Sequence, residues 1–418
     1  MTEAVTNWAG NITYAARRVH RPASVDELRR IVAGAARVRA LGTGHSFNRL
    51  ADTDGDLVSL AALPTAISID PQSGTVTVGG GVRYGELAAH LHAHGYALHN
   101  LASLPHISVA GACATATHGS GRHNGNLATA VRAIELVTAT GDLLRLDGSH
   151  ADFAGAVVGL GGLGIVANLT LAIEPAFDVA QYVYHGLSHA SLTDNWAQIL
   201  DSGYSVSFFT SWTGPDIDQI WIKRRTDRDN PAVDVDAWGI TAADGPRHPV
   251  PGRPAHNCTG QLGVTGAWHT RLPHFRLDFT PSSGAELQSE YLVPATTALA
   301  ALDAVDRIRD VVAPVLQICE IRTVAADELW LSMNHRRDSV AIHFTWIADT
   351  AAVAPVMDAL EQALAPYSPR PHWGKLFGVG PDELRGRYER WADFAELLAR
   401  YDPAGTFGND FLDRYFPR

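Results

Sequence analysis

The chain has 418 residues, of which 46% are hydrophobic and 18% charged, and its 33 basic and 44 acidic residues give a net charge of −11. This composition is typical of a globular protein with a large core, and the length predicts two or three domains. The acidic balance and the lack of a basic run argue against nucleic acid as a partner, so we expect a small-molecule ligand.

The three cysteines, Cys113, Cys258 and Cys319, are odd in number and lack metal-ligand spacing, which argues against a disulfide framework and against a zinc site. The first ten residues contain no basic segment followed by an apolar one, so we expect a cytoplasmic protein. His90 and His94 are the only pair at helical spacing in their histidine-rich segment, and no acidic ligand follows them in register. We therefore expect no metal site.

The first predicted helix begins at a capping box formed by Ser24 and Glu27, and its apolar face continues to about residue 36. A short strand, "RVRAL", follows. Gly42 and Gly44 then allow backbone N–H groups to converge on one anion, which suits a diphosphate. His45 lies at the rim of this turn. On this segment alone, a histidine bonded to its own loop is the simpler interpretation.

Residues 105–121, "PHISVAGACATATHGSG", are almost entirely small between Ser108 and Ser120. Such side chains bury little apolar surface, but they let a large flat ligand approach the backbone and offer hydroxyls to phosphate and ribose. A tightly packed helix pair is the alternative interpretation. The segment therefore favours a second part of the same ligand site.

Residues 153–173 are uncharged and long enough to span a bilayer, but they include five glycines and alternate like a strand in their second half. We therefore expect no membrane span. Gly159, Gly161 and Gly164 match G-x-G-x-x-G, yet a strand follows them where a dinucleotide fingerprint requires a helix. We expect these glycines to permit close approach of the backbone to another element or a ligand.

Together, the G-x-G-H-S turn, the segment ending in T-H-G-S-G and the "GLGIV" strand resemble the FAD domain of the vanillyl-alcohol oxidase and p-cresol methylhydroxylase superfamily. The resemblance implies FAD as cofactor, with His45 bonded through a ring nitrogen to the 8α-methyl of the flavin. The implied FAD-binding residues are Ala40, Leu41, Gly42, Thr43, Gly44, His45, Ser46, Ser103, Ser108, Gly111, Thr115, Ala116, Thr117, His118, Ile165, Val166 and His372.

Two strands of the second half carry polar residues on one face. "QICEIRTV" places Glu320 and Arg322 on the same side, and "SVAIHFTW" does so for His343 and Thr345. A polar strand face is often simply solvated. The alternative is recognition of a polyol, whose many hydroxyls need several donors and acceptors on a rigid sheet.

Only two lysines occur in the chain, Lys223 and Lys375. A lysine where arginine is otherwise used suggests a need for a compact cation, or for one able to lose its proton. Lys375 lies between apolar and aromatic stretches, which favours a functional role. Lys223 stands among arginines in "WIKRR", and we expect it at the surface.

The resemblance extends over the whole chain and is sharpest to the alditol oxidases, with the sugar-lactone oxidases nearer than vanillyl-alcohol oxidase itself. The motifs that carry it are "NWAGN", "ASLPHISVAG", "CEIRTVAAD", "HFTW", "RPHWGK" and "DPAGTFGNDF". It implies that hydride passes from C1 of xylitol or sorbitol to the flavin, that O2 is reduced to H2O2, and that His372 lies against the flavin. The implied substrate-binding residues are Ser103, Glu320, Arg322, Thr345 and Lys375.

Oxidation of an alcohol also removes its proton, so a base or a strong alkoxide stabiliser must lie near C1. Lys375 and Arg322 are the candidate cations, and His343 is the other candidate base. The sequence does not decide between Lys375 and His343. Two other functions remain open: an aldonolactone oxidase or dehydrogenase of the same fold, and a flavin- or sugar-binding protein without turnover.

The expected fold is α+β. An FAD domain is predicted over residues 1–175, a substrate domain with a large, mainly antiparallel sheet over 176–376, and a C-terminal segment returning to the FAD domain over 377–418. Residues 226–260 are rich in Pro, Gly and Asp and are expected to be loop. We expect a monomer whose partners are a polyol and O2.

Overall fold

The computed structural model describes residues 5–279 and 285–418. Its N-terminal part contains a small parallel sheet of strand order β1-β3-β2. The strands are β1 (Arg18–His20), β2 (Val38–Leu41) and β3 (Asp56–Ser59). Helix α1 (Val25–Ala33) connects β1 to β2, and Ser24 Oγ accepts from Glu27 N as the capping box predicts. The helix ends three residues earlier than expected because Gly34 caps it.

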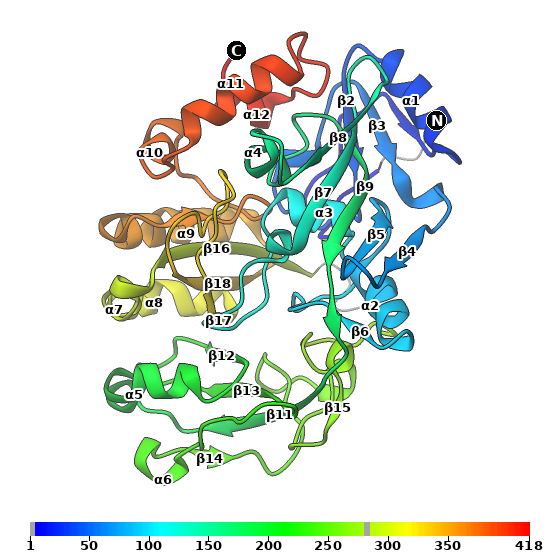
Figure 1. Cartoon of the computed structure of the whole chain (residues 1–418). Coiled ribbons are helices and arrows are strands. Elements are labelled where there is room, and N and C mark those ends of the chain that lie inside the picture. The colour runs from blue at the N-terminus through cyan, green and yellow to red at the C-terminus, as the bar shows by residue number, and fades with distance from the viewer. Residues whose placement is uncertain (1–4, 280–284) are drawn as a thin grey trace.

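A five-stranded antiparallel sheet of order β4-β5-β9-β7-β8 packs beside the first (Figure 1). Its strands are β4 (Ile67–Asp70), β5 (Thr75–Gly79), β7 (Val131–Val137), β8 (Leu143–Asp147) and β9 (Ile165–Ala172). The associated elements are α2 (Tyr84–Ala93), α3 (Val109–Ala114), α4 (Phe153–Val157) and the short pair β6 (Tyr96–Ala97) and β10 (Glu174–Pro175). Strand β9 follows the glycines at 159–164, as predicted.

The apolar stretch over residues 153–173 is divided between α4 and β9, with a turn between them. In the described ranges 5–279 and 285–418, no helix is both long and apolar enough to cross a membrane.

The second half is built on a large antiparallel sheet of order β14-β11-β13-β12-β17-β18-β16-β19, with β15 paired to β11. The central strands are β11 (Asp178–His185), β12 (Ser205–Thr210), β13 (Gln219–Arg225), β16 (Glu286–Pro294), β17 (Leu316–Val324) and β18 (Ser339–Ile347). The short ones are β14 (Thr241–Ala242), β15 (Gly266–Ala267) and β19 (Arg370–Pro371). Residues 226–260 are mostly irregular, as expected.

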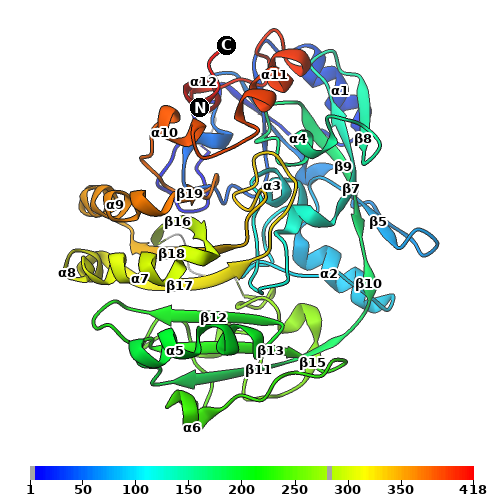
Figure 2. The same ribbon diagram turned by 60° about the vertical axis from the view of Figure 1, so that its left-hand side comes forward.

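Helices cover one face of this sheet (Figure 2). They are α5 (His189–Asp201), α7 (Ala298–Asp306), α8 (Arg309–Val312) and α9 (Thr350–Leu364), with the short α6 (Val235–Trp238) near β14. Their apolar residues share one core with the odd-numbered face of β17, where Cys319 and Ile321 are fully buried. The opposite face of β17 is therefore turned toward the N-terminal half.

The C-terminal helices α10 (Pro381–Arg385), α11 (Trp391–Tyr401) and α12 (Asp410–Tyr415) pack against the N-terminal half (Figure 1). Asn409 Nδ2 donates to the carbonyls of Arg49, Leu50 and Asp52, and Arg39 donates to the carbonyl of Phe407. Residues 407–409 thus hold β2 and the segment that follows it in place.

Candidate active site

One cavity of about 480 Å³ lies between the glycine turn after β2 and the polar face of the large sheet. This size is within the range of small-molecule and cofactor sites. Its lining includes these residues from the sequence analysis: Ala40, Leu41, Gly42, Thr43, Gly44, His45, Ser46, Ser103, Ser108, Gly111, Thr115, Thr117, His118, Val166, Glu320, Arg322, His343, Thr345, His372 and Lys375. Segments far apart in the sequence therefore meet at one site.

Two predicted cofactor residues lie elsewhere. Ile165 and Ala116 have buried side chains in the apolar cores and do not line the cavity. Strand alternation explains the first case, because neighbouring residues of β9 point to opposite faces and Val166 takes the side of the cavity.

The turn over residues 42–46 is held by the N-terminal segment. Trp8 N donates to the Gly44 carbonyl at 2.8 Å, and Asn7 Nδ2 donates to the Ser46 carbonyl at 2.9 Å. Gly44 has a φ of +72°, which a residue with a side chain rarely adopts. A Cβ at Gly42 would lie 2.7 Å from Ser108 Oγ. Glycine at positions 42 and 44 therefore keeps open a concavity, which a ligand can occupy.

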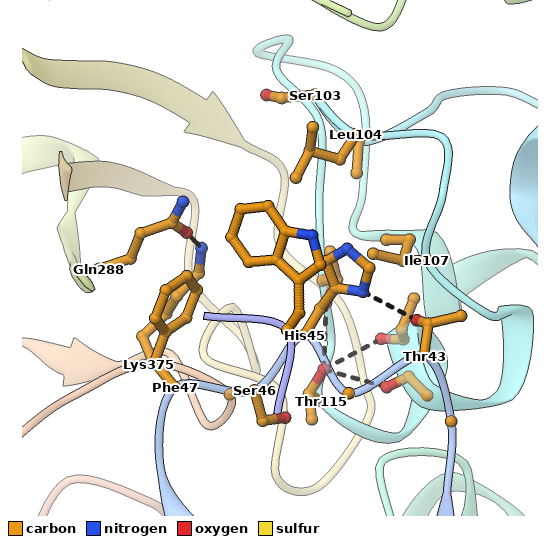
Figure 3. A pocket seen from close by; sticks show the side chains of 18 of the residues that line it. Thr43, His45, Ser46, Phe47, Ser103, Leu104, Ile107, Thr115, Gln288 and Lys375 are labelled. Atoms are coloured by element: carbon orange, nitrogen blue, oxygen red, sulfur yellow. Dashed lines mark hydrogen bonds between the residues drawn. The ribbon is translucent and has the colours of Figure 1, made fainter. Parts of the chain in front are cut away.

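His45 projects from this turn beside Thr43 (Figure 3). Its Nδ1 lies 2.9 Å from Thr43 Oγ1, and its ring stacks on Trp8 with the centroids 5.1 Å apart. Its Nε2 is buried and forms no hydrogen bond within the described residues. Burial, with smaller contributions from His106 and Lys375, lowers the pKa of His45 to about 4. The imidazole is therefore neutral at pH 7, and its Nε2 is not engaged by another described residue.

The small-residue segment lies next to this turn and forms another part of the cavity wall. Thr115 Oγ1 is 3.0 Å from Thr117 Oγ1, which in turn lies 3.5 Å from His372 Nε2. Ser108 N donates to Thr43 Oγ1 at 3.3 Å, which ties the two segments together. Hydroxyls and backbone, with little apolar bulk, therefore face the ligand on this side.

Three strands of the large sheet place a row of polar side chains at the far end of the cavity. In the antiparallel register, His343 of β18 lies opposite Glu290 of β16 on one side and Glu320 of β17 on the other. Directly paired residues share a face. Arg322 and Thr345, two residues along their strands, extend the same surface. All five side chains are buried, so the simple solvated-face interpretation does not hold.

Charges in this row compensate one another. Arg322 Nη2 donates to Glu290 Oε1 at 2.5 Å, and Arg322 Nε lies 3.6 Å from Glu320 Oε1. Burial alone would raise the pKa of either glutamate, but Arg322 and the neighbouring histidines together outweigh burial and hold both pKa values below their usual range; these histidines include His118 at Glu290 and His274 at Glu320. Both carboxylates are therefore ionised acceptors. Arg322 Nη1 also reaches Ser103 Oγ at 3.3 Å.

Lys375 lies at the β16 side of the row, where its Nζ donates to Gln288 Oε1 (Figure 3). The ammonium also lies 5.3 Å from the centre of the Phe47 ring. Burial, together with the nearby charge of Arg322, lowers the pKa of Lys375 to about 8, although Glu290 opposes the shift. Burial likewise lowers the pKa of His343, and Lys375 adds to this effect. Near neutral pH, Lys375 is thus a cation able to release its proton, and His343 is neutral.

Lys223 is not a surface residue, so that expectation was wrong. Its side chain on β13 is 1% exposed. The arginine after it points to the opposite face of the strand, and residues 268–275 cover the side that Lys223 occupies. The cationic residues next to Lys223 in the sequence therefore do not predict whether its own side chain is exposed.

Gln288, Glu290 and His274 are among the cavity residues that were not found from the sequence. Gln288 and Glu290 lie on β16, where Glu286, Gln288 and Glu290 occupy every second position, as Glu320 and Arg322 do on β17. This pattern could have identified them. His274 comes from an irregular segment, and no local signal marks it.

Residues 16–147 match the family model described as FAD binding domain, and residues 285–415 match the model described as D-arabinono-1,4-lactone oxidase. The chain is also 57% identical to an alditol oxidase of a Streptomyces species, with 99% of both chains covered. The chain belongs to the alditol oxidase family. It is an FAD-dependent oxidoreductase, and the resemblance seen in the sequence is confirmed.

More distant members of the wider superfamily share its length and fold. L-gulono-1,4-lactone dehydrogenase of Mycobacterium tuberculosis is 29% identical over 99% of both chains. The crystal structure of cholesterol oxidase from B. sterolicum superposes with a TM-score of 0.78 at 15% identity and covers 99% of this chain and 96% of its own. The predicted two-part α+β architecture of the vanillyl-alcohol oxidase type is thereby confirmed.

The cavity fits the cofactor of this family. An elongated dinucleotide needs backbone approach at its diphosphate, which the open glycine turn provides, and a flat ring system needs a wall of small side chains, which residues 108–117 provide. Within the described part of the chain, no group bonds the buried Nε2 of His45, which also lines this cavity.

Proposed function

We propose that this protein oxidises the terminal primary alcohol of an alditol such as xylitol or sorbitol to the aldose, with O2 as acceptor and H2O2 as second product. The observation that carries the proposal is the buried polar row at the end of the FAD cavity, in a chain 57% identical to an alditol oxidase. A purified preparation should consume O2 with xylitol or sorbitol. Equal or faster turnover with aldonolactones and none with alditols would contradict the proposal.

Substrate hydroxyls would be held by groups already ionised and fixed on the sheet. Glu320 accepts hydrogen bonds, Arg322 donates them, and Ser103 and Thr345 can do either. Because Arg322 is paired with Glu290 at 2.5 Å, its guanidinium is oriented before a ligand arrives. A ligand with a hydroxyl on every carbon can satisfy these groups together, whereas an apolar alcohol would leave buried charges unmatched.

Removal of the hydroxyl proton at C1 falls to Lys375 or His343. When bound, the flavin would supply the hydride acceptor for C1 and pass the electrons to O2. Lys375 and Arg322 would stabilise negative charge that develops on the substrate oxygen, in a site from which water is largely excluded. His343 is neutral and lies 3.3 Å from Thr345 Oγ1, so its ring can take up a proton. Both assignments of the base remain part of the proposal.

The pH dependence distinguishes the two roles of Lys375. If the ammonium is the active form, the limiting rate of flavin reduction should fall as pH rises through the Lys375 pKa of about 8. Anaerobic stopped-flow measurements from pH 6 to 10 test this, and the fall should be absent in Lys375→Met. A rate that instead rises through pH 8 would make neutral Lys375 the base.

We also propose that the FAD is bonded covalently to a ring nitrogen of His45. The neutral imidazole, its buried Nε2 that no other described residue engages, and the ring held between Trp8 and Thr43 support this. Acid precipitation should leave the yellow colour with the protein, and His45→Ala should release it to the supernatant. Colour in the supernatant of the wild type would refute the linkage. A flavin-bearing peptide without His45 would refute the site.

A second candidate is oxidation of an aldonolactone, which the match of residues 285–415 to the D-arabinono-1,4-lactone oxidase model favours. The polar row could hold the hydroxyls of a lactone as well. Comparison of kcat/KM for xylitol, sorbitol and gulono-1,4-lactone separates the two functions. A protein that binds FAD but turns over none of these would be the remaining alternative.

We further propose that the protein acts as a monomer in the cytoplasm. All three cysteines, which lie in the described part of the chain, are buried and unpaired, which suits a reducing compartment. Sedimentation analysis and cell fractionation address these two points.

A further inference from the structure

Lys223 lies beside the polar row, at its β13 side, whereas Lys375 lies at the β16 side. Its Nζ donates to the carbonyls of Leu272 and Pro273 and lies 3.0 Å from His274 Nδ1. These three acceptors match the three protons of an ammonium group. The pattern is therefore complete only when Lys223 is protonated and His274 Nδ1 accepts.

His274 connects this lysine to the substrate end of the cavity. Its Nε2 lies 2.7 Å from Glu320 Oε1, and Phe209 and Trp221 contact its ring edge to face. In a neutral imidazole, one nitrogen donates while the other accepts. If Nδ1 accepts from Lys223, the proton must be on Nε2, which then donates to the Glu320 carboxylate. With the opposite tautomer, the Nε2 lone pair would face that carboxylate.

We propose that Lys223 is a positioning residue for substrate binding, because it fixes the tautomer of His274 that holds Glu320 in place as an acceptor. The contacts of His274 and Arg322 with Glu320 both fall on Oε1, so Oε2 can accept from a substrate hydroxyl. Lys223 itself does not line the cavity. It acts through His274 and Glu320, in the manner of an outer residue that orients a ligand-binding group.

The proposal predicts a pH dependence of substrate affinity. Burial lowers the pKa of Lys223 to about 7 against the opposing charge of Glu320, and Arg322 lowers it further; Cys258 is the other titratable neighbour. Burial and Lys223 lower the pKa of His274 to about 4, so this ring is neutral in the relevant range. As pH rises through the Lys223 pKa, its third donor is lost and KM for the alditol should rise.

The test uses the flavin-loaded enzyme with xylitol and therefore rests on the proposed function. Lys223→Met should raise KM for xylitol about tenfold while kcat changes less than about threefold, and the rise of KM with pH should disappear. His274→Gln supplies the matched background, because an amide donates to Glu320 whatever Lys223 does. In that background, Lys223→Met should change KM less than about twofold.

An equal increase of KM in both backgrounds, or an unchanged KM in Lys223→Met, would overturn the proposal. A second measurement needs no substrate and no variant of Lys223. The ¹⁵N spectrum of histidine-labelled wild-type protein, with His274 assigned by its absence in His274→Gln, should place the proton on Nε2. A proton on Nδ1 would equally overturn the proposal. Absence of xylitol oxidation in the wild type, with the proton on Nε2, would count against the proposed substrate alone.

Discussion

Replacement of Lys375 by methionine should slow flavin reduction about a hundredfold or more, which is the scale for loss of an electrostatic stabiliser or a general base. The ammonium is fixed by Gln288 beside the polar row, and the pKa of about 8 leaves it charged at pH 7. Charge that develops on the substrate oxygen makes this interaction stronger in the transition state than in the ground state. The chemical step should therefore suffer more than binding.

Anaerobic stopped-flow reduction with saturating xylitol measures this step without interference from O2. Methionine keeps most of the side-chain length and removes the charge, and Lys375→Arg serves as a control that keeps a cation at the same position. A near-normal limiting rate in Lys375→Met, with weak alditol binding, would reduce Lys375 to a positioning role. His343 would then be the leading candidate for the base.

Replacement of Glu320 by glutamine should lower kcat/KM for alditols by about 2 kcal/mol or more, roughly thirtyfold. Glu320 is buried, ionised and adjacent to both Arg322 and His274. The amide has the same shape but removes one of the two carboxylate charges beside Arg322 and offers a weaker acceptor to the substrate. Flavin content should not change, because Glu320 lies at the sheet end of the cavity, away from the glycine turn.

Glu361→Gln is a matched control for this variant. Glu361 is also an acid with a buried partner, Tyr291, whose hydroxyl donates to Oε1 at 2.7 Å, but it does not line the cavity. Its replacement should leave alditol kinetics close to those of the wild type. Wild-type kinetics in a folded, flavin-loaded Glu320→Gln protein would mean that this face of β17 does not contact the substrate.

Local sequence signals predicted much of the fold correctly because they depend on neighbouring residues. Ser24 and Glu27 start α1 because their side chains accept from backbone N–H groups within one turn, and the alternation after Gly164 specifies β9 regardless of its partners. Alternation likewise places Glu320 and Arg322 on one face of β17, and His343 and Thr345 on one face of β18. These relations are fixed by the two-residue period of a strand.

The tertiary structure alone decided which of these faces meet and what covers them. The register that aligns Glu290, His343 and Glu320 pairs residues up to 53 positions apart in the sequence, and no local pattern specifies it. The burial of Lys223 was likewise not predictable from its neighbours in the sequence. Its arginine neighbours suggested the surface, yet a segment about 50 residues later buries it against His274. Composition and periodicity thus determine the elements and the polarity of their faces, whereas burial, and with it each pKa, depends on long-range packing.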